Sequence, residues 1–425
     1  VTVALKRENS SCTHARTVAQ FAVLMLHAAI CAALLGIGAL IPAAASAAAL
    51  PGFYTVPAHI PRAAGAVIKT QRVSTDGTDA SAVYRVMYVS RTLDLKPVAV
   101  TGLIFVPRTP APAGGYPVVS WGHGTSGMAD ICAPSLQPAS AVPQINQLLA
   151  EGWLVTASDY QGLGTPGLLP YLVGDVAARN TIDIVRAAHR FKADHASTNY
   201  VVWGHSEGGQ TAMFGLHIGA AYAPDLHLKG VVAGAPPSQF ALIYAFLTTS
   251  PFRYYLFMAG FGFEAAYGPK RAPLHEILTK AALTEEPVLN RGCDNYLQNH
   301  IDKFTLKDFV KVDPFKVPAW KKILTANDPA SFTTPVAAPL LIYQGGSDEQ
   351  IPPVSTQVLA QQLCKTGQDL ERWIYPGQSH AGVIAPASGD FIHWIADRFA
   401  NQPNPDPYQP VGQPGIMTAT CPSLS

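Results

Sequence analysis

The chain is 425 residues long, which is enough for one large α/β domain that carries a sizeable insertion. Charged residues make up only 13% of it, and 29 Lys and Arg against 28 Asp and Glu leave a net charge of +1. This balance does not indicate the basic surface that nucleic-acid-binding proteins use. The 35 Gly and 36 Pro follow no period and alternate with apolar runs, which excludes a collagen-like chain and argues against global disorder.

The first fifty residues have the pattern of an export signal. Lys6 and Arg7 precede an apolar run over residues 21–41, and small residues follow over 43–49. We expect a Sec-type signal peptide over residues 1–48, cut near Ala47 or Ala49, and hence a secreted protein, extracellular or periplasmic. An uncleaved membrane anchor is the alternative, because about 20 apolar residues can span a bilayer.

Cysteine usage agrees with export. Cys12 and Cys31 lie in the expected signal, so cleavage would leave four cysteines: Cys132, Cys293, Cys364 and Cys421. None of these four has the spacing of a metal site, and an even number in an exported chain predicts two disulfides with three pairings open. Four free, buried thiols are the alternative.

The remaining chain alternates between strand and helix patterns. Three β-rich runs come first and are typical of an antiparallel opening: 67–73, 82–90 and 98–107. Continuous apolar runs, expected of buried parallel strands, follow at 117–121, 153–157, 200–203, 228–233, 339–343 and 370–375. Helical patterns occur at 142–150, 173–193, 207–221, 354–364 and 390–400. The alternation predicts an α/β fold with a mostly parallel sheet.

One long interval interrupts this rhythm. About 100 residues separate the strand run that ends at Ala233 from the one that begins at Pro339. The interval is helical in pattern and starts with ten aromatic residues: Phe240, Tyr244, Phe246, Phe252, Tyr254, Tyr255, Phe257, Phe261, Phe263 and Tyr267. We expect a helical cap over residues 238–334, inserted between core segments 49–237 and 335–425 and covering the carboxyl edge of the sheet.

The segment Gly204-His205-Ser206-Glu207-Gly208 matches G-x-S-x-G. The string is weak evidence alone, but it follows an apolar strand and precedes a helix, which is the context of a nucleophile elbow. The serine of an elbow sits on a strained turn, and side chains two residues away on either side would collide with neighbouring elements. Ser206 is therefore the candidate nucleophile. We interpret His205 as elbow packing, with its side chain pointing away from the serine oxygen.

A serine nucleophile needs a base, and the base needs a carboxylate that holds its tautomer, in the chain order Ser, Asp or Glu, His. Asp348 stands at a glycine turn after a buried strand and is the candidate acid, with Glu349 as the alternative and a purely turn-forming Asp as another. His380 follows the next strand and is the candidate base. Three other histidines lie in helical patterns instead of at strand ends: His275, His300 and His393.

An oxyanion hole needs two backbone N–H donors, each worth about 3 kcal/mol. The first falls to Glu207, whose carboxylate we treat as incidental. The second is expected in the glycine-rich loop 122–127, a flexible turn, from the N–H of Thr125 or, as the alternative, of Gly124. A loop that merely turns the chain is the other interpretation. Asp159 ends a strand at the same edge, and we expect a supporting role for it, bracing the elbow or lining an acyl pocket.

These motifs resemble those of the secretory lipase family, the lipase-A-like group of α/β-hydrolases. The resemblance runs from about Tyr54 to Cys421 and rests on D-Y-x-G-x-G at Asp159, the elbow, the helical interval, Q-G-x-x-D-x-x-I-P at residues 344–352 and H-x-G at His380. It implies an α/β-hydrolase fold with a helical cap, and disulfides Cys132–Cys293 and Cys364–Cys421. Fungal members often have G-Y-S-G-G at the elbow, and their oxyanion loop is not the W-G-H-G-T of this chain.

We therefore expect a secreted serine ester hydrolase, a lipase or carboxylesterase, that cleaves acylglycerols or other hydrophobic esters through an acyl-enzyme. No metal or organic cofactor is implied, and the sequence indicates no oligomeric state. We expect some cap rings to line an acyl tunnel or to dock on lipid aggregates. The alternatives are an acyltransferase or peptidase on the same fold, and a non-catalytic secreted binding protein.

Overall fold

A ten-stranded sheet runs through the structure, a computed structural model that describes residues 50–192, 195–404, 410 and 415–424. Its spatial order is β1-β2-β3-β5-β4-β6-β7-β8-β9-β10. The antiparallel strands β1 (Val67–Val73), β2 (Ala82–Arg91) and β3 (Pro97–Val106) open it. The parallel part comprises β4 (Tyr116–Gly122), β5 (Leu154–Ser158), β6 (Ala196–His205), β7 (His227–Gly234), β8 (Leu340–Gly345) and β9 (Leu370–Tyr375). The predicted fold class is confirmed, whereas the expected signal peptide lies outside the described residues.

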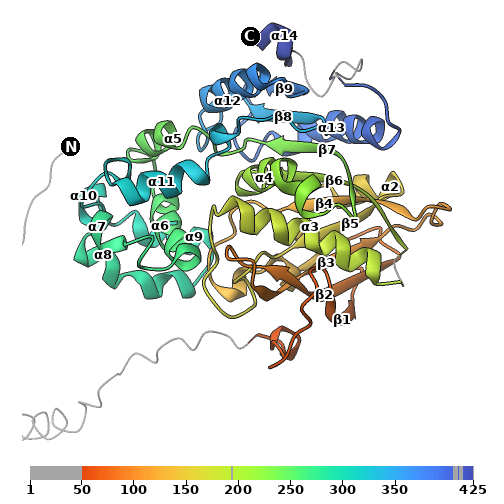
Figure 1. Cartoon of the computed structure of the whole chain (residues 1–425), viewed down its shortest axis with the longest axis horizontal. Helices are drawn as coiled ribbons and strands as arrows, with labels where there is room; N and C mark the ends of the chain where they lie inside the picture. The colour runs from red at the N-terminus through yellow and green to blue at the C-terminus, as the bar shows by residue number, and fades with distance from the viewer. Residues whose placement is uncertain (1–49, 193–194, 405–409, 411–414, 425) are drawn as a thin grey trace, which may run out of the picture. The chain divides into compact units, whose positions relative to one another are not determined.

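Helices cover both faces of the sheet (Figure 1). The helices α3 (Gly174–Arg190), α4 (Glu207–Tyr222) and α12 (Pro353–Thr366) share one apolar core with it, and α2 (Ile145–Ala150) and α13 (Ile384–Phe399) share another. The predicted start of the last of these helices at Asp390 is wrong by six residues. Val383 and Ala387 precede Phe391 at helical spacing and are fully buried, so the apolar face that packs on the sheet begins earlier.

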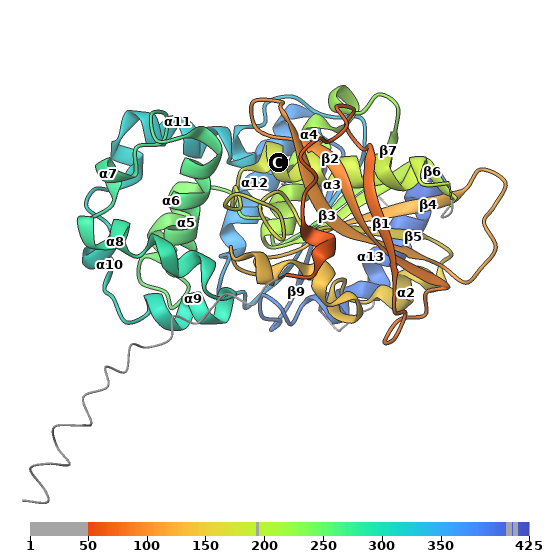
Figure 2. The ribbon, with the colours of Figure 1, turned by 90° about the horizontal axis from the view of Figure 1, so that it is seen from below.

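The described chain between β7 and β8 is helical. It contains α5 (Phe240–Leu247), α6 (Tyr254–Tyr267), α7 (Leu274–Ile277), α8 (Lys280–Thr284), α9 (Asp294–Ile301), α10 (Leu306–Phe309) and α11 (Pro318–Ala326). These helices gather beside the sheet in both views (Figure 1, Figure 2). Phe257, Phe263 and Trp320 are buried among them. We refer to residues 238–334 as the cap. Within the part of the chain described, no helix combines the length and apolarity that a membrane crossing requires.

The end of the chain adds an edge strand that sequence analysis does not predict. Strand β10 (Met417–Thr420) pairs antiparallel with β9, and the short helix α14 (Cys421–Leu424) follows. Four residues are too few for a recognisable strand pattern, and the free edge of β9 supplies the pairing. A disulfide between Cys364 on α12 and Cys421, the residue after β10, holds this edge strand in place.

Replacing both Cys364 and Cys421 with Ser should lower the free energy of unfolding by about 4 kcal/mol, because the bridge closes a loop with a sequence separation of 57 and restricts the unfolded chain. Denaturant unfolding of the two oxidised proteins measures the difference. An unchanged midpoint and slope would show that this bridge contributes nothing to stability.

Candidate active site

Ser206 stands between the end of β6 and the start of α4, in a strained backbone conformation with φ 60° and ψ −124°. Its N–H donates to the carbonyl oxygen of Gly234 at 2.9 Å. A Cβ at Gly204 would lie 2.0 Å from the carbonyl oxygen of Gly208, and a Cβ at Gly208 would lie 1.8 Å from that of Gly122. Only glycine permits these approaches, so the elbow geometry depends on the two glycines of the motif.

Asp348 and His380 form a buried pair beside the elbow. Asp348 Oδ2 lies 2.8 Å from His380 Nδ1, and both side chains are at most 5% exposed. Its other oxygen, Oδ1, accepts hydrogen bonds from the N–H groups of Gln350 and Ile351, at 2.9 and 2.8 Å. The alternative acid, Glu349, reaches His380 only at its backbone N–H, at 3.0 Å. The geometry thus favours Asp348 as the group that orients the imidazole.

The imidazole of His380 has one buried nitrogen left for chemistry. Its Nε2 has no hydrogen-bond partner among the described residues, and no hydrogen bond joins it to Ser206. The ring of His205, the residue before the nucleophile, lies 4.7 Å from the ring of His380 between centroids. The base is therefore held next to the elbow with a nitrogen free to accept a proton.

The interpretation of His205 as elbow packing alone was incomplete. The carboxyl end of β6 and the loop after β9 converge, so this side chain packs on the base and places Nδ1 3.3 Å from the hydroxyl of Tyr343. Burial, and secondly the neighbouring His380, lower the pKa of His205 well below its usual range. The ring consequently stays neutral and places no positive charge beside the base.

The loop after β4 lies against the nucleophile. A Cβ at Gly124 would be 3.5 Å from Ser206 Cβ, and Thr125 Oγ1 lies 2.7 Å from the hydroxyl of Tyr171. Both expected donors, Thr125 and Gly124, thus belong to a segment in contact with the elbow. The choice between Thr125 and Gly124 as the second donor stays a prediction.

This loop is braced, and the expected flexible turn is wrong. The ring of His123 stacks on that of Tyr160 at 4.2 Å, with Nδ1 2.7 Å from the carbonyl oxygen of Gly124 and Nε2 3.2 Å from that of Asp159. The hydroxyl of Tyr160 donates to the carbonyl oxygen of His123 at 3.1 Å. Sequence reasoning missed both aromatic residues, because their contacts join segments far apart in the chain.

The far end of the same loop is attached to the cap. The N–H of Asp294 donates to the carbonyl oxygen of Ser126 at 3.1 Å, and Gly127 pairs with Cys293 in an isolated antiparallel bridge. Cys293 in turn forms a disulfide with Cys132 across a sequence separation of 161. This pair and Cys364–Cys421 are the pairings that the family resemblance implies.

Asp159 braces a different place from the one expected. Its fully buried carboxylate accepts hydrogen bonds from Thr101 Oγ1 at 2.7 Å, from the N–H of Ser135 at 2.7 Å and from the hydroxyl of Ser135. Burial raises the pKa of this carboxyl to about 6. The side chain therefore ties β3 to the turn at Ser135, and it neither contacts the elbow nor lines the cap cavity described below.

The carboxyl of Glu207 is not incidental. The residue begins α4, directly after the nucleophile, and is only 2% exposed. The Thr125 hydroxyl lies near its carboxyl group, and burial raises the pKa of this carboxyl to about 8. Sequence reasoning had a signal available, since an ionisable residue follows the serine where a buried helix start was predicted.

Solved structures with the same architecture identify the class of fold. Lipase A of Candida antarctica in its closed state aligns with a TM-score of 0.71 at 20% identity, covering 86% of this chain and 90% of that one. A rice cell wall degrading esterase of Xanthomonas oryzae aligns with a TM-score of 0.64 at 18% identity, covering 80% of this chain and all of that one. The protein therefore has the α/β-hydrolase fold.

Sequence comparison identifies the family. The model of the secretory lipase family matches residues 136–406, so the chain belongs to that family. A secreted triacylglycerol lipase of Malassezia globosa is 26% identical over 341 residues, which cover 74% of this chain and 71% of the relative. The family resemblance predicted from the motifs is confirmed, and the protein is a secreted ester hydrolase of the lipase and carboxylesterase class.

Replacing Gly208 with Ala should remove at least 99% of the ester-hydrolase activity and lower the thermal midpoint, because a Cβ there would lie 1.8 Å from the carbonyl oxygen of Gly122 and displace the nucleophile. Hydrolysis of a soluble ester and a thermal melt measure both effects. The matched control is Gly389→Ala in α13, where a Cβ meets nothing within 4 Å and should stabilise the helix by up to about 1 kcal/mol. Equal behaviour of the two variants would contradict this account of the elbow.

Proposed function

We propose that the protein hydrolyses carboxylic esters with apolar acyl chains, triacylglycerols among them, using Ser206 as nucleophile, His380 as base and Asp348 as the residue that orients the base. The observation that carries this proposal is the buried Asp348–His380 pair at 2.8 Å, whose imidazole has an unpartnered Nε2 and packs on His205, the residue before a strained serine. The curated relative with the printed name of triacylglycerol lipase supports the substrate class.

The proposed reaction proceeds by two acyl transfers. Ser206 Oγ attacks the ester carbonyl carbon while its proton passes to His380 Nε2, and the carbonyl π electrons move to oxygen. The N–H of Glu207 and one N–H from residues 124–125 would stabilise this oxyanion. The oxyanion then collapses, and His380 returns the proton to the departing alkoxide. Water repeats the sequence on the acyl-enzyme and releases the carboxylic acid.

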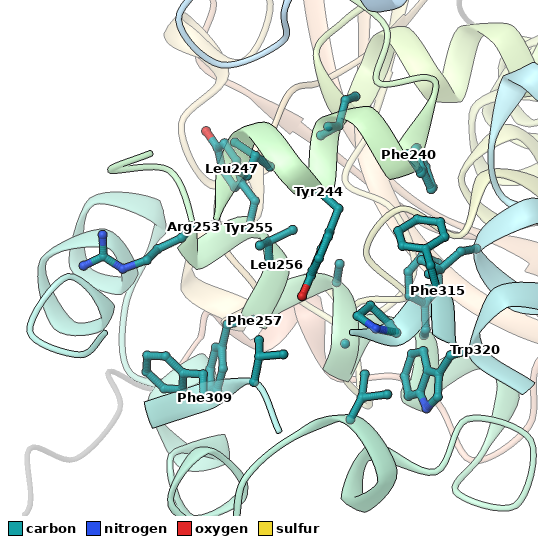
Figure 3. Close-up of a pocket in the computed structure, with 18 of the residues that line it drawn as sticks. Phe240, Tyr244, Leu247, Arg253, Tyr255, Leu256, Phe257, Phe309, Phe315 and Trp320 are labelled. Atoms are coloured by element: carbon teal, nitrogen blue, oxygen red, sulfur yellow. The ribbon is translucent and has the colours of Figure 1, made fainter. Parts of the chain in front are cut away.

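An apolar cavity inside the cap offers a site for the acyl chain. The space between its lining atoms measures about 940 Å³, which includes a part open to solvent. In Figure 3, Tyr244 and Leu256 lie between Phe257 on one side and Phe315 on the other. Leu247, Ile277 and Leu324 also line it. Such walls favour alkyl chains over polar groups.

Tyr255 connects this cavity with the catalytic pair. Its ring belongs to the cavity wall, and its hydroxyl donates to Gln350 Oε1 at 2.8 Å, two residues after Asp348. Neither Ser206 nor His380 lines the cavity. We infer that an acyl chain bound at the nucleophile reaches the cavity by passing this tyrosine.

The ten aromatic residues at the start of the cap divide among three environments. Five line the cavity: Phe240, Tyr244, Tyr255, Phe257 and Phe263. Four others pack within the cap without lining it: Phe252, Tyr254, Phe261 and Tyr267. Phe246 is 37% exposed, and Tyr296 on α9 is 39% exposed. The rings therefore support an acyl site more strongly than a docking surface for lipid aggregates. Phe246 and Tyr296 are the exposed rings that such a surface could use.

Ser206→Ala should reduce ester hydrolysis by several powers of ten while leaving the thermal midpoint within about 1 °C, because the substitution removes only the nucleophilic oxygen. Initial rates on short-chain p-nitrophenyl esters measure the loss. Near wild-type turnover by the purified variant would refute the proposed nucleophile.

Leu256→Trp should depress hydrolysis of long-chain esters at least tenfold more than hydrolysis of acetate or butyrate esters. The larger indole side chain would fill the cavity, whose wall includes neither residue of the catalytic pair. The ratio of kcat/KM across a series of acyl lengths measures this effect. Ala245→Trp on α5 is the control, since Ala245 is exposed and lies outside the cavity wall. An equal loss at all chain lengths would mean that the cavity does not hold the acyl group.

A further inference from the structure

The carboxyl of Glu207 is a buried ionisable group at the reacting centre that the reaction described above does not use. Its backbone N–H is the expected oxyanion donor, so its side chain is attached close to where negative charge would develop. The residue is 2% exposed, and its Oε2 has no hydrogen-bond partner among the described residues.

No cation compensates this carboxyl. None of the ion pairs within the described residues includes Glu207. The hydroxyl of Thr125 lies near it and is itself 2.7 Å from the hydroxyl of Tyr171. A buried carboxylate with so little compensation is unfavourable, whereas the neutral acid can occupy the same place at little cost.

The groups that face Glu207 offer no compensating positive charge. Tyr160 and Tyr171 approach it from loops of the core, and Tyr255 approaches it from the cap. Tyr255 also interacts electrostatically with two more carboxyl groups, Asp294 in the cap and Glu349 after β8. The other titratable groups beside the nucleophile are the pair of Asp348 and His380 and the neutral ring of His205.

We propose that Glu207 is a further positioning residue, which supports ester hydrolysis only while its carboxyl is protonated, so that loss of this proton disables the oxyanion side of the site at alkaline pH. This inference rests on the proposed function. A protonated carboxyl keeps the Thr125 loop in place without adding charge. An ionised one would repel the oxyanion that the N–H of the same residue has to stabilise.

The direction of the pH effect follows from the cause of the shift. Burial raises the pKa of Glu207 to about 8, while the nearby Thr125 hydroxyl acts in the opposite direction. The positive end of α4 also favours the anion, and burial outweighs it. The active, protonated form therefore predominates below about pH 8 and declines above it, so activity should fall at alkaline pH.

The test is the pH profile of kcat and kcat/KM for a short, water-soluble ester between pH 6 and 10, in wild type and in Glu207→Gln. Wild-type kcat should fall about tenfold for each pH unit well above the pKa, because only the protonated form works. Glu207→Gln is always neutral and nearly the same size, so it should keep its activity across this range. The same alkaline fall in both proteins would overturn the proposal.

A second variant keeps the proposal testable even if the first does not fold. Thr125→Val removes the nearby hydroxyl that favours the anion, so the alkaline fall should move to higher pH. An unmoved fall would contradict the proposal. The matched control is Glu151→Gln, which removes an exposed carboxylate at the end of α2 and should leave the alkaline fall where it is in wild type.

Failure of this proposal can be told apart from failure of the proposed function. Titration of each protein with a phosphonate ester that labels the active serine counts the competent sites and checks folding. If Ser206→Ala still hydrolyses the ester, the proposed function is wrong. If Ser206→Ala is inactive and Glu207→Gln falls with wild type at alkaline pH, only the role of Glu207 is wrong.

Discussion

The close approach of three glycine backbones underlies the whole site. Gly208 at the start of α4 lies against Gly122 at the end of β4, and Gly204 lies against Gly208, at separations that no side chain would allow. This contact draws the helix onto the sheet and leaves Ser206 in a strained conformation, with φ 60°. The loop after β4 starts at the same point, so the nucleophile and its expected oxyanion donors are positioned by one contact.

Features that depend on local pattern could be predicted from the sequence. Continuous apolar runs identified the parallel strands because both of their faces are buried, and the strand-turn-helix context identified Ser206. Asp348 and His380 followed from their positions after strands, and the structure places them 2.8 Å apart. Each of these residues was identified from the strand and turn pattern around it, and the triad also from its order along the chain.

Features that depend on contacts between distant segments could not be predicted. The burial of the Glu207 carboxyl, which raises its pKa to about 8, involves Thr125 and Tyr171, and both are far from it in sequence. Asp159 was assigned to the elbow because both lie at one edge, yet its carboxylate binds Ser135. Strand β10 likewise exists because β9 has a free edge, and its own residues give no indication of it.

The bridge between Cys132 and Cys293 changes how the cap can move. The chain leaves the sheet after β7 and returns at β8, and two such connections alone would form a hinge axis about which the cap could rotate as a rigid lid. The disulfide adds a third attachment, beside the loop that contacts the nucleophile. The bridge therefore restrains rotation of the cap about an axis through its two chain connections, and it links any displacement of the cap to the oxyanion loop.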